Sequence, residues 1–123
     1  LTVTGVTREF AYEPNGLDTA DMPARWVRLP SSGLAVDSSY ASADNDTSKT
    51  RTAEIVIAVE PAGQGTASAN TTAMLTMIDN LETALDAWDA TRPGYVDYSI
   101  DSGQVTIGGI PYLALIATVT TRG

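Results

Sequence analysis

Hydrophobic positions in the second half of the chain first follow the period of a helix. Between residues 70 and 90 the apolar residues recur at spacings of three and four, which at about 100° per residue places them on one face within an arc of about 100°. These residues are Met74, Met77, Ile78, Leu81, Leu85 and Trp88. Asn70 or Thr71 can cap the start, and Pro93-Gly94 prevents continuation at the end. The pattern predicts one long amphipathic helix packed on a sheet.

Strand-like alternation surrounds this helix. Residues 51–60 alternate an apolar set from Ala53 to Val59 with more polar positions, which predicts a strand with one buried face. Residues 95–100 predict a second strand, and Asp101-Ser102-Gly103 predicts a turn after it. Gly108-Gly109 predicts the tight turn of a hairpin between strands 104–107 and 110–120. The last strand is long and mostly apolar, so we expect it in the middle of the sheet.

The first half of the chain is less regular. Residues 2–12 are rich in β-branched and aromatic side chains and predict a strand, residues 17–22 predict one helical turn, and residues 25–29 predict a short strand. Residues 31–50 are mostly small and polar, which predicts an irregular hairpin arm or a long loop. Long polar segments of this kind often make functional contacts. The candidate contact residues of the arm are Val36, Tyr40, Asp44, Asp46 and Lys49.

Together these elements predict an α+β fold in a single domain, residues 1–123. We expect a single mixed, mostly antiparallel β-sheet with one long amphipathic helix packed on it and an extended β-hairpin arm. The chain starts at Leu1 without an initiator Met, and we expect further residues before it.

Composition narrows the classes of function. The chain has 7 Lys and Arg against 15 Asp and Glu, a net charge of −8, which argues against a surface that grips nucleic-acid phosphates. It has no His and no Cys, so the usual general base, thiol nucleophile and soft metal ligands are missing. We therefore expect a protein that is not an enzyme and that needs no cofactor.

Two segments resemble ligand-binding loops only in part. Residues 44–48 open like a calcium loop, but Lys49 stands where such a loop needs Gly, and Ile55 stands where it needs a bidentate Glu. Gly63-Gln64-Gly65 lies between a strand and a helix, as a phosphate loop would, but it lacks the third Gly and a Gly-Lys-Ser or Gly-Lys-Thr sequence. We expect no metal site, and we interpret the glycine pair as a connector.

Four acids form a stripe beside the apolar face of the predicted helix. No Lys or Arg lies between Thr71 and Ala90 to neutralise them. The stripe consists of Asp79, Glu82, Asp86 and Asp89. One interpretation is an ordinary solvated face, and the other is a charged surface that faces something that must not adhere.

The order and spacing of several segments resemble the tail-terminator (tail completion) proteins of siphophages and their prophage relatives. In the first half the resemblance rests on Gly5-Val6-Thr7-Arg8 with a following aromatic residue, and on the segment from Leu17 to Ala24 that leads into a strand. In the second half it rests on the strand from Arg51 to Val59, a Gly-containing loop, a helix that starts at an Asn or Asp, and the segment from Asp101 to Leu113. Such proteins usually have an amphipathic helix before the first strand, which fits the expectation that residues precede Leu1.

The resemblance implies a virion structural protein of the phage tail or neck, assembled in the host cytoplasm. Family members form a ring, typically a homo-hexamer, at the head-proximal end of the tail tube, where they stop tube growth and join the tail to the head. The implied partners are the tail-tube protein and a head-neck connector protein. DNA would pass through without specific binding, no membrane is involved, and the stripe of Asp79, Glu82, Asp86 and Asp89 would be a candidate surface for the lumen.

Two alternatives remain open. The nearer one is another neck component, such as a head-closure or connector ring, or a subunit of the tail tube. The more distant one is a small secreted β-rich module that binds a ligand.

Overall fold

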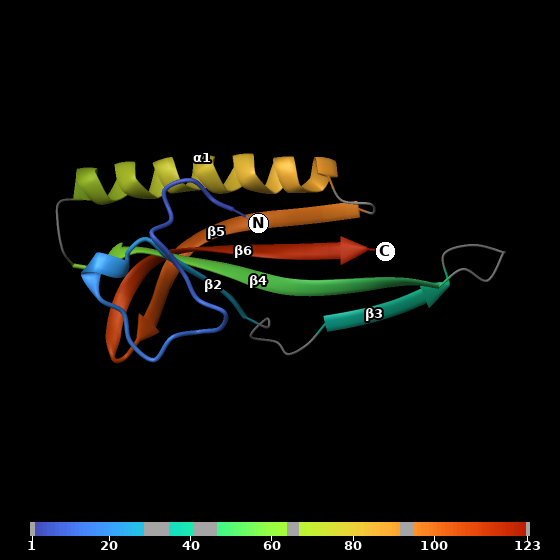
Figure 1. The fold of residues 1–123 in the computed structure, drawn as a ribbon, viewed down its shortest axis with the longest axis horizontal. Coiled ribbons are helices and arrows are strands. Elements are labelled where there is room, and N and C mark those ends of the chain that lie inside the picture. The colour runs from blue at the N-terminus through green and yellow to red at the C-terminus, as the bar shows by residue number, and fades with distance from the viewer. Residues whose placement is uncertain (1, 29–34, 41–46, 64–66, 92–94, 123) are drawn as a thin grey trace.

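The computed structural model describes residues 2–28, 35–40, 47–63, 67–91 and 95–122, which form one sheet and one long helix (Figure 1). The strands are β1 (Arg8–Glu9), β2 (Ala24–Arg28), β3 (Ala35–Tyr40), β4 (Thr47–Pro61), β5 (Tyr95–Ile107) and β6 (Ile110–Arg122). The helices are a 3₁₀ turn, η1 (Thr19–Asp21), and α1 (Ala67–Thr91). The predicted α+β fold, with a mostly antiparallel sheet, one long helix and a hairpin arm, is confirmed.

The sheet has the strand order β1-β2-β4-β6-β5, and β3 also pairs with β4. Only the β1–β2 pair is parallel among the pairs of the described strands. The 15 residues of β4 accommodate two neighbours on one side, because β2 pairs with residues 54–58 and β3 pairs with residues 47–52. The β3–β4 hairpin therefore extends the sheet lengthwise beyond β2, and β6 lies between β4 and β5 as predicted.

Helix α1 covers one face of the sheet. The side chains of Met77, Leu81 and Leu85 are buried there against Ile57 and Leu115, and the other predicted face residues are partly buried around them. The predicted buried stripe is thus confirmed. No helix in the described ranges is long and apolar enough to cross a membrane.

The opposite face of the sheet carries a second core that the sequence pattern did not predict. Val56 and Ala58 of β4 are fully buried, so this strand is covered on both faces. They pack with Trp26 of β2 and Tyr112 of β6. What covers this face is the N-terminal segment.

We call residues 2–23 the N-terminal strap, because this segment passes from one face of the sheet to the other. Val3 belongs to the core under α1, whereas Phe10, Leu17 and Met22 pack on the opposite core. The prediction of a strand over residues 2–12 is wrong, since only Arg8–Glu9 pairs as a strand. A continuous strand would stay within the sheet. The strap instead leaves the sheet and buries apolar side chains in the cores on both of its faces. The predicted helical turn is present as η1.

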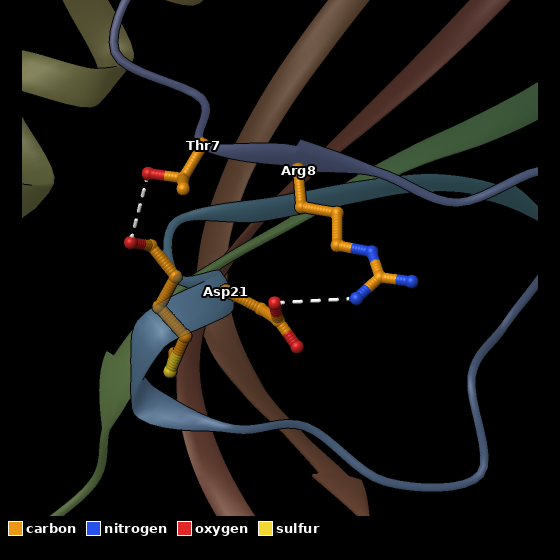
Figure 2. A network of polar contacts seen from close by, with 4 residues as sticks. Thr7, Arg8 and Asp21 are labelled. Carbon is orange, nitrogen blue, oxygen red and sulfur yellow. Dashed lines mark hydrogen bonds and ion pairs between the residues drawn. The ribbon is translucent and has the colours of Figure 1, made fainter.

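Ion pairs and hydrogen bonds hold the strap at the edge of β2. Arg8 pairs with Asp21 at 3.3 Å, and the Thr7 hydroxyl donates to the Met22 carbonyl at 3.0 Å (Figure 2). Arg25 of β2 pairs with Glu9 at 2.9 Å, directly across the β1–β2 register. A partly exposed ion pair contributes little alone, but together with the backbone contacts the two pairs fix where the strap crosses the edge.

The predicted turn at Asp101-Ser102-Gly103 is wrong, because β5 runs without interruption from Tyr95 to Ile107. These three residues pair with Ile116, Leu115 and Ala114 of β6. The long neighbouring strand offers backbone partners along its length, and this pairing overrides the local turn chemistry. The predicted hairpin turn is confirmed: Gly108 and Gly109 have φ values of +61° and +81° and connect the paired residues Ile107 and Ile110.

The two turn glycines allow a matched test of the fold. A Cβ at Gly108 would lie 3.0 Å from the Asn15 carbonyl oxygen of the strap, whereas a Cβ at Gly109 would meet nothing within 4 Å. We expect Gly109→Ala to cost about 1 kcal/mol through backbone strain alone, and Gly108→Ala to cost more because the strap must also shift. Urea unfolding of the two variants measures the difference, and equal costs would contradict the strap contact.

Candidate functional site

The candidate functional features of the described residues are surfaces. The chain has no His or Cys, and in the described ranges no group of three or more acidic residues is arranged to hold a metal ion. Two surfaces predicted from the sequence and one that the sequence did not reveal are the candidates for function.

The first surface is the arm formed by β3 and the first half of β4. In the backbone register Val36 is opposite Arg51, Ser38 is opposite Lys49, and Tyr40 is opposite Thr47. The hairpin arm predicted for this segment is therefore present, with Val36, Tyr40 and Lys49 in its paired strands. The other two candidates, Asp44 and Asp46, lie outside the described residues.

The second surface is the acidic stripe of α1. Asp79, Glu82 and Asp86 are exposed, as predicted for residues beside the buried face. Asp86 accepts a hydrogen bond of 2.6 Å from the hydroxyl of Tyr98 on β5, which ties this part of the helix to the sheet. The side chain of the fourth candidate, Asp89, lies outside what is described. The structure thus brings three of the four acids to one exposed side of the helix.

The third surface is an open groove of about 450 Å³ between the first half of α1 and the middle of β5. Its apolar wall contains Met74, Leu75 and Ile78 of the helix and Leu113 of β6, and Ser102 to Gln104 of β5 form the far wall. Leu75 is 57% exposed, one of a few large apolar side chains with such exposure. It precedes Asp79 by four residues and Glu82 by seven, so the groove leads directly into the acidic stripe.

A sequence signal for this groove exists. Leu75 falls outside the arc of the six predicted core residues and among the acids, so an apolar residue interrupts an otherwise polar side of the helix. The opposite wall does not follow from the sequence, because Asp101-Ser102-Gly103 has the residue types of a turn although it lies within β5.

The positive charges are distributed unevenly. Arg8, Arg25 and Arg28 form ion pairs with Asp21, Glu9 and Glu54, all in the part of the fold near β2. Of the other four cations, Arg92 lies outside the described residues, and the remaining three lie at the arm end of the sheet. These are Lys49 and Arg51 of β4, and Arg122 of β6, which is opposite Thr50.

The fold therefore carries an apolar groove continued by acids on the helix, and a hairpin with cations at the other end of the sheet. No protein-family model and no curated protein matches the chain.

Proposed function

We propose that this protein is a non-enzymatic structural component of a phage virion. It forms a homo-oligomeric, hexameric ring at the head-proximal end of the tail tube, ends the polymerisation of the tube, and joins the tail to the head through a neck connector protein. The proposal combines the order of segments that resembles tail-terminator proteins with a fold whose exposed features suit assembly.

The β3–β4 hairpin is the observation that carries the proposal. It lies beyond the end of α1, so that the helix covers the sheet over its core but not along the arm (Figure 1). The base of the arm also pairs with β6, whereas residues 38–40 and 47–49 have no third partner among the described strands. A two-stranded end of this kind is marginally stable in water without a further packing partner. A neighbouring subunit would supply that partner.

The net charge of −8 agrees with a ring through which DNA passes. Nucleic acid is drawn to surfaces where Lys and Arg neutralise its phosphates, and counterion release then holds it there. A strongly acidic subunit would give DNA little to adhere to, so that the ring would not slow transit.

Light scattering after size exclusion, together with electron microscopy, tests the proposal. We expect closed rings of uniform size from the purified chain, and rings at one end of the tail tube in intact particles. Added to growing tubes, the protein should shorten them in proportion to its concentration, because each capped end stops growing. Filaments of the chain alone would instead indicate a tube subunit, and a strictly monomeric chain absent from virions would exclude assembly.

A further inference from the structure

The groove on α1 and β5 is an apolar surface whose surroundings restrict what can fill it. Leu75, which lines the groove, is more than half exposed, and Asp79 and Glu82 follow it along the same side of the helix. The helix has no Lys or Arg of its own to balance these carboxylates. A complementary occupant therefore presents apolar groups together with positive charges.

The arm of the same chain has this combination on one face. Cross-strand partners share a face of a sheet, so the register assigns Val36, Tyr40, Lys49 and Arg51 to one face of the hairpin. By the same alternation, this is the face on which Ile55 and Ile57 of β4 pack under α1. The acid of β3, Asp37, is opposite Thr50 and belongs to the other face.

The two surfaces lie at opposite ends of the molecule. In Figure 1 the start of α1, which forms one wall of the groove, lies at the left, and β3 lies at the right, beyond the end of the helix. One copy cannot place its own arm in its own groove. Contact between them requires two copies, and it is heterologous, since different patches meet.

We infer that the arm of one copy docks on the groove and acidic stripe of the next copy. In this contact the hairpin face to which the register assigns Val36, Tyr40, Lys49 and Arg51 lies over the groove around Leu75 and over Asp79 and Glu82. A heterologous contact repeated from copy to copy closes into a ring when its rotation permits. The inference rests on the proposed function and specifies which surfaces join the subunits.

This contact also gives the acidic stripe a role. Of the two roles that the sequence suggests, a solvated face or a surface for the lumen, neither explains why an apolar groove leads into the stripe. As one half of an interface, the stripe selects the cationic face of the arm and rejects a second acidic helix, because like charges brought together are unfavourable.

Reciprocal charge reversal tests the contact. One variant carries Lys49→Glu and Arg51→Glu, and the other carries Asp79→Lys and Glu82→Lys. Each alone would place like charges on both surfaces, and we expect the dissociation constant between copies to rise at least about 100-fold for either variant. An equimolar mixture would restore opposite charges at every contact, and we expect oligomers in which the two variants alternate. Light scattering gives the mass, and a tag on one variant gives the stoichiometry.

A matched control carries Glu13→Lys and Asp18→Lys, which reverse two exposed acids of the strap and should leave assembly unchanged. Circular dichroism verifies that each variant keeps the helix. Folded variants that assemble alone like the natural chain, or that stay apart when mixed, overturn the inference while the proposed function stands. If the natural chain does not self-associate at all, the proposed function fails together with the inference.

Discussion

Replacing Leu81 with Asp should unfold the protein. Leu81 is 0% exposed in the middle of α1, and it packs in the core with Ile57 and Leu115. A carboxylate at this position would lose its hydration without gaining a hydrogen bond or an ion pair. The packing contacts of the leucine side chain would be lost as well. We expect a cost of about 5 kcal/mol or more, comparable with the whole stability of a domain of this size. Circular dichroism should show loss of the helix signal at room temperature.

Two further variants make this result quantitative. Leu81→Ala only removes packing and should cost about 2–5 kcal/mol in urea unfolding. Thr76→Asp adds a carboxylate at an exposed position of the same helix and should change stability by about 0.5 kcal/mol. If Leu81→Asp behaved like Thr76→Asp, α1 would not pack on the sheet through this face.

Deleting residues 36–48 should abolish assembly and leave the fold intact. The deletion joins Ala35 to Lys49, and because Ala35 is opposite Thr52, residues 49–51 remain to close a short hairpin. Such a loop lies in the usual range of about 2–5 residues. The buried core residues described in β4, from Ile55 to Val59, all lie outside the deletion. We expect a monomer with an unchanged helix signal.

Size exclusion with light scattering measures the mass of this variant, and thermal unfolding monitored by circular dichroism measures its stability. The monomer formed by Lys49→Glu and Arg51→Glu is a useful reference, because it keeps the whole arm. Complete assembly without residues 36–48 would show that the arm is dispensable and would remove it from the proposed ring. A deletion variant with lost helix signal would show that the arm belongs to the folding unit, which contradicts its assignment as an assembly element.

The helix and the central strands could be predicted because their local patterns agree with their places in the fold. Met77, Leu81 and Leu85 follow the helical period, and Ile55 and Ile57 follow the strand period. The buried face of the helix therefore packs against the buried face of the strand in one core. The Gly108-Gly109 turn was also predictable, since its positive φ values favour this residue type. The prediction worked where a single period describes the environment of a segment.

The strap could not be predicted in this way. The β-branched residues of its first part are typical of a strand, but the strap places Val3 under α1 and Phe10 on the far side of the sheet. No single period describes a segment that changes layers. The strand through Ser102 and Gly103 has a different cause: the local residues are typical of a turn, but pairing with Leu115 and Ala114 across the β5–β6 hairpin keeps them extended.

The sequence predicts the acidic stripe and the arm as separate surfaces, but it does not predict the groove or how these surfaces are arranged. The acids and the arm follow from charge pattern and composition, whereas the groove requires β5 to pass beside α1. The contact that we infer between the arm and the helix depends on the register of β3 with β4, which the sequence pattern does not give.

The crossing of the strap at β2 has a consequence for solubility. A bare strand edge is a template for amyloid-like addition of further strands. Beside β2 this template is interrupted, because the strap occupies it with Arg8 and Glu9, two charged residues tied by ion pairs to Asp21 and Arg25. The ion pairs of the strap thus help to protect the backbone edge of β2 against aggregation.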